Sequence, residues 1–418
     1  MCPVILALVL SAGQPLDLSS VGDGASLPEL VWKQSPELRD ARIRIAQADA
    51  ERRKALRLPN PGLDLGLNTI PVGPLNPPDL KDPFLNVPNV AVGLSVLLEI
   101  GKRGPRQEAT SEAARAAALD ALDLVRRRTL DLEDLIGDVA SAQVRVDALQ
   151  SLGADAQRLA ELQAARADKG DTSALDADRA KLEVEGTLTA IGEAQELLAA
   201  TQRACAEIVA IPCTQFADVT QANAWLDRHV RTGGPVEQRP DVRALEASIK
   251  SARAAQLLAS RGWLPDPTVR FGYVRDQFVV SGNQQNSFFV GVSMPLPLFE
   301  RGQDDAEAAR IAAETTEQAR ARLLEAANAQ LTRVDAEIVT VETRQKRVKE
   351  QSLPLARSVV SRLDAAVTRG AAPLQELLLA RRTLAELLLT AAELDRTVFH
   401  LRVARARLSS SLELQVSP

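Results

Sequence analysis

Two long stretches of the chain place apolar residues at the three- and four-residue spacing of amphipathic helices. These stretches cover residues from about 105 to 210 and from about 303 to 412. In the first, Leu119, Leu122 and Val125 follow one another at this spacing. Almost nothing in either stretch breaks a helix, so the pattern predicts two unusually long helical regions.

Each helical stretch has one clear interruption near its middle. Lys169 and Gly170 interrupt the first, and Arg369 and Gly370 interrupt the second. A basic residue followed by Gly is typical of a helix C-terminus, and the Thr and Ser that follow in the first stretch can cap a new helix. Each stretch is therefore predicted to be an antiparallel hairpin with its Gly at the tip. An arm of roughly 60 residues is about 90 Å long, which suits a coiled-coil tube.

The second hairpin has a further irregularity in its first arm. Pro354 is expected to kink this arm or to mark a helix break, and Gly153 lies at a comparable place in the first hairpin. These paired positions indicate a functional bend near the tips, and the alternative is a tolerated irregularity.

Outside the hairpins the pattern changes to a period of two. Residues 62–70 read GLDLGLNTI, in which Leu alternates with polar residues or Gly, as in a two-faced strand. Segments at about 89–100, 267–280 and 286–299 have the same strand character. The sequence therefore predicts four strands.

The order of these elements repeats along the chain. A helix before each strand pair begins with Pro, an acid, an apolar residue and Arg, and ends at Leu-Pro-x-Pro. The matching segments are PELR at 36–39, PDVR at 240–243, LPNP at 58–61 and LPDP at 264–267. We therefore expect an internal two-fold repeat, with a first repeat over 28–230 and a second over 231–418, each holding a helix, two strands and a hairpin.

Strands of about ten residues suit a tilted crossing of a bilayer. Four strands alone would leave two unpaired edges in lipid, so closure needs several copies, and three copies would supply twelve strands. A four-stranded soluble sandwich is the alternative. It is disfavoured because long helices, and not turns, separate the strand pairs.

Composition supports long helices and offers little chemistry. Hydrophobic residues make up 45% of the chain but aromatic residues only 3%, which is typical of helical coiled coils. The net charge of −5 provides no basic excess for nucleic acid. His229 and His400 are isolated in the sequence, so we expect no metal site and no cofactor. Without a nucleophile motif or a phosphate-binding loop, we expect no enzyme.

Cysteines and the N-terminus bear on the compartment. Cys205 and Cys213 bracket the segment CAEIVAIPC, which is open to two interpretations: a local disulfide in an oxidising compartment, or two buried free thiols. Residues 1–27 form a signal-like or flexible N-terminus, with a short apolar run but no basic region before it. Cys2 precedes that run and is not placed as a lipid-accepting cysteine.

Aromatic residues near the strands are few. The candidates for an aromatic belt at a membrane interface are Trp263, Phe271, Tyr273, Phe288 and Phe289. Trp263 directly precedes a predicted strand, where an interface anchor is expected.

Residues 36 to 412 together resemble the TolC-type outer-membrane efflux protein family. The specific motifs are LPNPGLDLGL and LPDPTVRFGY, and LLEIGKRGPRQEA at 97–109 is similar to the heavy-metal, CzcC-like branch. The resemblance implies an α+β membrane protein. Long antiparallel helical hairpins of a homotrimer form an α-barrel, and four strands per chain share a 12-stranded outer-membrane β-barrel.

The same resemblance implies a passive channel of a tripartite efflux system in the outer membrane of a Gram-negative bacterium, with a large periplasmic portion. Its partners would be outer-membrane lipid, a periplasmic adaptor (membrane fusion) protein and an RND-type inner-membrane pump, which supplies the energy. The branch implies divalent metal cations as substrates.

Asp176 and Glu376 match acidic positions of the family's tip motif, since each lies six residues after a tip glycine. The resemblance therefore implies that they line the pore tip. A narrow mouth ringed by carboxylates attracts cations, and the alternative is two ordinary solvated carboxylates. Val367 and Ala372 stand where the family has a gating Tyr and Arg, and Leu379 replaces a further acid. Gating is therefore expected to rest on other contacts, such as apolar packing.

One rival hypothesis explains the long helices equally well, namely a non-pore coiled-coil structural or scaffold protein of the envelope. Only the channel explains strand pairs at equivalent points of two repeats, because a heptad scaffold would not stop at Pro-x-Pro and resume as strands.

Overall fold

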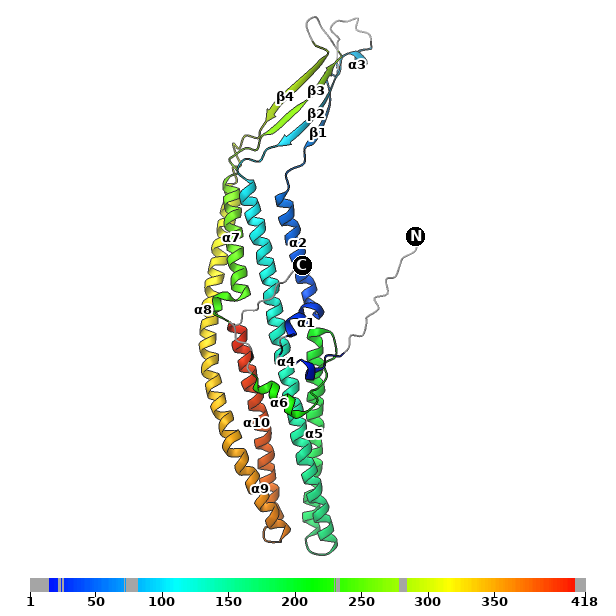
Figure 1. Cartoon of the computed structure of the whole chain (residues 1–418), viewed down its shortest axis with the longest axis vertical. Coiled ribbons are helices and arrows are strands. Elements are labelled where there is room, and N and C mark those ends of the chain that lie inside the picture. The colour runs from blue at the N-terminus through cyan, green and yellow to red at the C-terminus, as the bar shows by residue number, and fades with distance from the viewer. Residues whose placement is uncertain are drawn as a thin grey trace. The chain divides into compact units, whose positions relative to one another are not determined.

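A computed structural model gives the fold of the chain (Figure 1). It describes residues 15–409 apart from 22–23, 25, 71, 73–81, 229, 231–233 and 278–283. Most of the predicted signal-like segment at 1–27 lies outside the described residues, as do His229 and the ends of the segments predicted at 267–280 and 303–412.

The chain divides into two compact units. One contains residues up to 43 together with 119–243 and from 322 onward, and the other contains 44–118 and 244–321. Each unit takes segments from both halves of the sequence, so the units cut across the predicted repeats 28–230 and 231–418. The division into repeats remains a prediction.

An antiparallel sheet of four strands in the order β1-β2-β3-β4 belongs to the second unit (Figure 1). The strands are β1 (Gly62–Asn68), β2 (Asn89–Leu97), β3 (Thr268–Asp276) and β4 (Asn286–Ser293). A short helix, α3 (Pro83–Asn86), which the sequence did not predict, precedes β2. The expectation of four strands in a helix-rich chain is confirmed.

All four strands end earlier than predicted. β1 ends at Asn68 and not at residue 70, and β3 ends at Asp276, although residues 278–280 of its predicted segment lie outside the described residues. β4 was expected to reach residue 299 but ends at Ser293, because Pro295 and Pro297 have no amide hydrogen to donate to a ladder. β2 was expected to reach residue 100 but ends at Leu97. There the Ile100 amide donates instead to the Asp266 side chain, 3.0 Å away.

Long helices form the rest of the described chain (Figure 1). The first hairpin is α4 (Arg103–Asp168) and α5 (Ala174–Val209); the second is α8 (Gln303–Arg347), a π-helical turn (Val348–Ser352), α9 (Leu353–Thr368) and α10 (Leu374–Ser409). The remaining α-helices are α1 (Leu27–Gln34), α2 (Glu37–Leu56), α6 (Val219–Asp227) and α7 (Pro240–Ser260). The sequence did not predict α1 and α6. No helix of the described residues is both long and apolar enough to cross a membrane.

The turns of both hairpins require glycine. Gly170 and Gly370 have φ values of +80° and +74°, in the left-handed region that ends helices without a Cβ penalty. Ser173 then caps α5 by accepting a hydrogen bond from the Asp176 amide. α5 ends at Val209 because Ala210 adopts a left-handed conformation.

Around α4, the first unit has a conventional core. Leu132, Ile136 and Val139 on α4 are fully buried, and Phe399 of α10 lies among the buried side chains. Gly137 admits this ring, because a Cβ there would lie 2.5 Å from it. The Trp225 ring of α6 lies 6.5 Å from the Phe399 ring and joins α6 to the same core.

Buried arginines donate hydrogen bonds to the last carbonyls of α10. Arg126 is buried beside Asp123 and donates to the Arg407 carbonyl at 2.7 Å, while Arg239 donates to the Leu408 carbonyl at 3.3 Å. Carbonyls in the last turn of a helix have no partner within the helix, so these guanidinium groups satisfy them.

Candidate functional site

One face of the sheet is apolar and exposed. The register places Leu63, Leu94, Phe271 and Val290 in one row across all four strands, and Leu65, Val92, Tyr273 and Phe288 in the next. All eight side chains are exposed, with Phe288 and Val290 at 87% and 79%. We call this surface the apolar face; it is a surface that a water-exposed monomer would normally cover.

The opposite face consists mainly of glycine and polar residues, and Phe289 is an aromatic exception. Its rows contain Asp64, Gly93, Gly272 and Phe289, and then Gly62, Ser95, Arg270 and Gly291. The Phe289 ring lies against the two glycines of its row, because a Cβ at Gly93 or Gly272 would come within 3.1 or 2.7 Å of it. Phe289 thus covers bare backbone on this side.

The five aromatic candidates for an interface therefore do not share one surface. Phe271, Tyr273 and Phe288 lie on the apolar face, whereas Phe289 lies on the other side and Trp263 is in the turn before β3. The sequence held the signal that separates Phe288 from Phe289, since neighbouring residues of a strand point to opposite faces. Sequence reasoning missed Phe299, which is 92% exposed just after β4.

The outer edges of β1 and β4 have no strand partner in the described part of the chain. Each edge presents a row of backbone N–H and C=O groups that a further strand can pair with. Because neighbouring strands alternate in direction, β4 runs antiparallel to β1.

An apolar cluster joins the two hairpins near their tips. Leu159 of α4 packs with Val367 of α9 and with Leu374 and Leu377 of α10, and Ala372 packs against this cluster. Val367 is only 3% exposed. Val367 and Ala372, two of the three positions that depart from the TolC-type tip motif, thus lie together in apolar packing.

Two arginines add polar contacts between the hairpins. Arg166, near the end of α4, donates to the Val367 carbonyl at 3.2 Å. Arg381 of α10 donates to the Asp155 carbonyl of α4 at 2.8 Å and to the Asp364 carboxylate of α9 at 3.0 Å. Sequence reasoning found neither arginine, because their partners lie on other helices and are mainly backbone atoms.

The structure gives Asp176 a local role. Its amide donates to the Ser173 hydroxyl at 3.1 Å, and its carboxylate accepts from the same hydroxyl at 2.8 Å. Ser173 is therefore the N-cap of α5, and the Asp176 carboxylate accepts a hydrogen bond from its hydroxyl group. Glu376 is exposed in the first turn of α10, and no described contact joins it to Asp176. Leu379 lines an apolar groove of about 570 Å³ beside Glu376.

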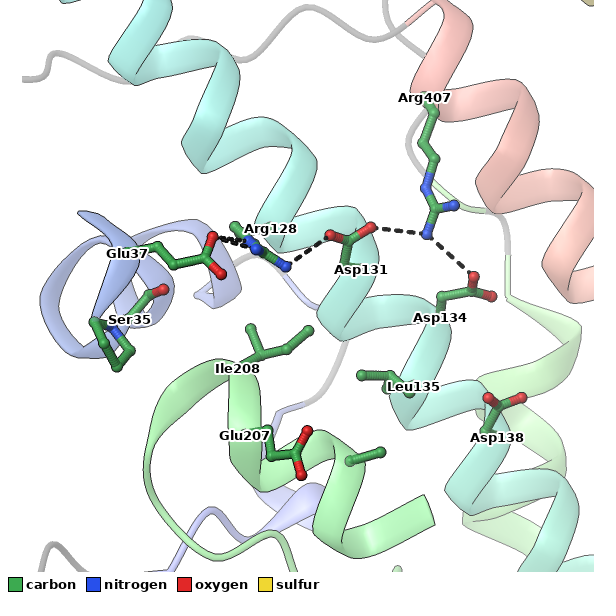
Figure 2. Close-up of a pocket in the computed structure, with 12 residues that line it drawn as sticks. Ser35, Glu37, Arg128, Asp131, Asp134, Leu135, Asp138, Glu207, Ile208 and Arg407 are labelled. Atoms are coloured by element: carbon green, nitrogen blue, oxygen red, sulfur yellow. Dashed lines mark hydrogen bonds and ion pairs between the residues drawn. The ribbon is translucent and has the colours of Figure 1, made fainter. Parts of the chain in front are cut away.

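A row of ion pairs connects α4 to α10 around a cavity of about 650 Å³ (Figure 2). Arg407 lies 3.0 Å from Asp131 and 3.1 Å from Asp134. Next to this cavity the His400 Nδ1 atom lies 3.0 Å from Asp134. His400 looked isolated in the sequence, and its acidic partner is on a different helix.

The carboxylate of Asp134 changes the titration of His400. Its hydrogen bond, helped by its charge, raises the pKa of His400 above 6.5, while partial burial and Arg407 oppose the shift. Within the described residues, no group of three or more His, Cys, Asp or Glu side chains is placed to hold a metal ion.

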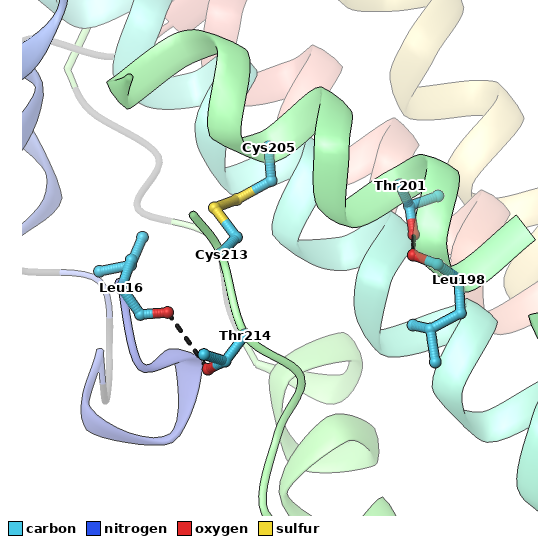
Figure 3. The surroundings of a disulfide bond; sticks show 6 residues. All are labelled: Leu16, Leu198, Thr201, Cys205, Cys213 and Thr214. Atoms are coloured by element: carbon cyan, nitrogen blue, oxygen red, sulfur yellow. Dashed lines mark hydrogen bonds between the residues drawn. A yellow bond between two sulfur atoms is a disulfide. The ribbon is translucent and has the colours of Figure 1, made fainter. Parts of the chain in front are cut away.

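Cys205 and Cys213 form a disulfide with a Cα–Cα distance of 6.1 Å (Figure 3). Cys205 lies in the last turns of α5, and the loop that contains Cys213 pairs with the N-terminal segment. The Leu16 amide donates to the Pro212 carbonyl at 2.7 Å, and the Thr214 amide donates to the Leu16 carbonyl at 3.0 Å. The disulfide thus fixes the loop around Cys213 to α5, and this loop in turn pairs with Leu16.

No protein-family model matches the chain, and no curated protein matches its sequence. Solved structures match its fold. CusC, whose crystal structures concern transmembrane channel formation, has a TM-score of 0.72 at 16% identity, over 93% of this chain and 92% of its own. VceC, an outer membrane protein of Vibrio cholerae, has a TM-score of 0.71 at 17% identity, over 92% and 95%.

The open state of the MtrE outer membrane channel of Neisseria gonorrhoeae has a TM-score of 0.68 at 13% identity, over 92% of this chain and 88% of its own. At these identities the likeness establishes the fold alone. The chain has the fold of outer-membrane channels of known structure.

The ion pair of His400 predicts a small dependence of stability on pH. Because the folded-state pKa is raised, the stabilisation is present below a pH of about 6.5 and is lost as the pH rises through the folded pKa. The side chain is more than half exposed, so the effect is below about 1 kcal/mol.

Thermal unfolding of the unaltered protein and of His400→Gln, followed by circular dichroism from about pH 5 to about pH 8, measures this dependence. The unaltered protein should lose more stability across this range than the variant. The same pH profile in both proteins would contradict the role of the pair.

Proposed function

We propose that the chain is one protomer of a trimeric export channel of the TolC type in the outer membrane of a Gram-negative bacterium. The observation that carries this proposal is the sheet, which has an exposed apolar face and two unpaired edges. The fold shared with solved outer-membrane channels supports it. The chain acts as a passive conduit and not as an enzyme.

In this assembly the apolar face lies against lipid and the opposite face lines the lumen. The β4 edge of one copy pairs with the β1 edge of the next, and the antiparallel alternation continues across this junction. Three copies then close a 12-stranded β-barrel without a free edge, which satisfies every backbone group that would otherwise face lipid.

The helical hairpins of the three copies form the periplasmic α-barrel. Their tips meet a periplasmic adaptor protein, and an RND-type inner-membrane pump supplies the energy. Equal hairpin lengths favour such a quasi-symmetric tube: α5 and α10 each have 36 residues, and the segment from Gln303 to Thr368 is as long as the 66-residue α4.

The structure narrows the proposal for the tip carboxylates. Asp176 is engaged in capping α5, whereas Glu376 is exposed beside an apolar groove. Glu376 is therefore the better candidate for a carboxylate that lines the mouth. The Oδ2 atom of Asp176 accepts the hydrogen bond from Ser173, so mainly its Oδ1 atom could face the channel mouth.

The first prediction of this proposal concerns the apolar face. Val290→Arg places a cation in lipid, at about 2–4 kcal/mol per copy if the site is near the bilayer midplane. The matched control is Gly291→Arg, which is adjacent but points to the other face, where a Cβ meets nothing within 4 Å. Outer-membrane fractionation and detergent-resistant trimer formation measure the outcome. Only Val290→Arg should lose trimer, and equal behaviour of the two variants would refute the orientation of the sheet.

A second prediction tests conduction and the contacts between the hairpins together. The purified protein should conduct in planar bilayers, and Arg381→Ala should raise the open fraction by about tenfold, because it removes hydrogen bonds from a charged donor. Arg382→Ala is the matched control, since Arg382 is exposed and, among the described residues, its ion pair is with Glu386 on its own helix.

No conductance from any of these proteins, together with a monomeric mass in detergent, would favour the non-pore scaffold of the envelope. Conductance that is the same in Arg381→Ala and Arg382→Ala would keep the channel and remove Arg381 from its control.

We propose divalent metal cations as the substrates, on the strength of the segment LLEIGKRGPRQEA and its resemblance to the heavy-metal branch. A host that carries the cognate pump and lacks this chain should become sensitive to zinc, cobalt, nickel or cadmium, and re-expression should restore growth. Unchanged growth on all these metals would remove the metal assignment but not the channel.

A further inference from the structure

A π-helical turn interrupts the second hairpin between α8 and α9. At Val348–Ser352 the Leu353 amide donates to the carbonyl of Val348, five residues earlier, where an α-helix would use four. Arg347 and Leu353 on either side keep right-handed helical angles, so the helix continues through the turn without ending. The break expected at Pro354 therefore takes the form of a π turn.

Pro354 explains the position of this turn. It is the second residue of α9, it has no amide hydrogen, and its ring would clash with the carbonyl four residues before it in an α-helix. A wider π turn, which accommodates one extra residue, relieves that clash. The first hairpin has no such turn, since α4 is a continuous α-helix across Gly153.

A buried carboxylate on α10 holds the turn in place. The Asp395 side chain is 8% exposed, and its Oδ1 atom accepts a hydrogen bond from Gln345 at 2.6 Å. The same oxygen lies 2.7 Å from the Lys349 ammonium. Gln345 precedes the turn and Lys349 lies within it, so Asp395 contacts both sides of the start of the π turn. A buried carboxylate that lost these donors would be costly.

Beyond the turn, α9 has two apolar stripes that are one residue apart. The inner stripe contains Val360, Leu363 and Val367, which belong to the cluster between the hairpins or pack against it. The outer stripe contains Leu355 and Val359, which are 67% and 40% exposed and line the groove of about 570 Å³. Consecutive residues of an α-helix differ by about 100°.

If the π turn winds into a regular α-helix, its extra residue turns α9 by one position. Val359 then takes the place that Val360 now has, and Ala366 takes the place of Val367. Val367 moves to the exposed place of Thr368. Arg362 takes the half-buried place of Leu363, so the wound register buries less apolar surface than the present one.

We propose that the π turn allows α9 to rotate by one residue position between two registers, which we call the register switch. The contacts of Asp395 to Gln345 and Lys349 stabilise the present register. The inference rests on the proposed function, in which rotation of α9 changes the width of the channel mouth. Pro354 keeps the wound register a minor population, on the order of one molecule in a hundred.

Two variants shift this equilibrium in opposite directions. Pro354→Ala removes the clash that opposes winding, so it should raise the population of the second register. Deletion of Glu350 removes the extra residue from the turn, so the helix becomes regular while α8 and α9 keep their present faces. Deletion should therefore fix the present register.

The experiment measures the rate of maleimide labelling of the full-length protein in isolated membranes. Every protein carries Cys2→Ser, and Cys205 and Cys213 stay in their disulfide, so that only the reporter cysteine reacts. Reporters are Val367→Cys, at a position now 3% exposed, and Val359→Cys, at a position now 40% exposed. In the Pro354→Ala background, Val367→Cys should label about tenfold faster and Val359→Cys more slowly. Deletion of Glu350 should slow labelling of Val367→Cys below its rate in the parent.

Opposite changes at the two reporters distinguish rotation from local unfolding, which exposes both. Faster labelling of both, or no change in either, overturns the register switch. Bilayer conductance separates this result from the proposed function. Conductance of the parent protein with unchanged labelling refutes only the switch, whereas absence of conductance with opposite labelling changes refutes only the channel.

Discussion

The constraint on which the rest of the structure depends is that the sheet cannot satisfy itself within one chain. β1 and β4 each leave a row of backbone groups without a strand partner in the described residues, and the apolar face is exposed across its rows. An unsatisfied backbone group costs several kcal/mol in lipid, and exposed apolar rows are costly in water. Further strands on both edges together with an apolar surrounding, as in the proposed barrel, would remove both costs.

The helices show the same incompleteness by a different route. Leu182 and Leu379 are exposed at 72% and 66%, although the chain has few aromatic residues and relies on Leu and Ala for packing. A hairpin whose apolar residues occupy more than one side buries one side within the chain and leaves another for neighbours. The exposed leucines therefore favour the proposed assembly, and the ion pairs between α4 and α10 join these helices within a single copy.

Local sequence rules predicted what depends on neighbouring residues and failed where distant residues meet. Periods of two and of three to four predicted the strands and long helices, and Gly170 and Gly370 marked the turns that adopt positive φ. Strand parity also separates Phe288 from Phe289, because neighbouring residues of a strand point to opposite faces. The pairing of His400 with Asp134 left no signal, because 266 positions separate them and nothing local requires either one.

At the tip of the second hairpin, the contacts between the hairpins depend on main-chain atoms. A sequence motif that specifies side chains cannot reveal such contacts. Val367 and Ala372 remove a lock made of hydroxyl and guanidinium groups, yet the hairpins remain joined. Arg166 and Arg381 donate to main-chain carbonyls, which every residue type provides, so their partners cannot be recognised by residue identity. The hydrogen bond of Arg166 to the Val367 carbonyl is partly buried beside this apolar packing, and the low polarity there strengthens it. A departure from a side-chain motif thus changes the contacts that join the hairpin tips and does not show that the tips are separate.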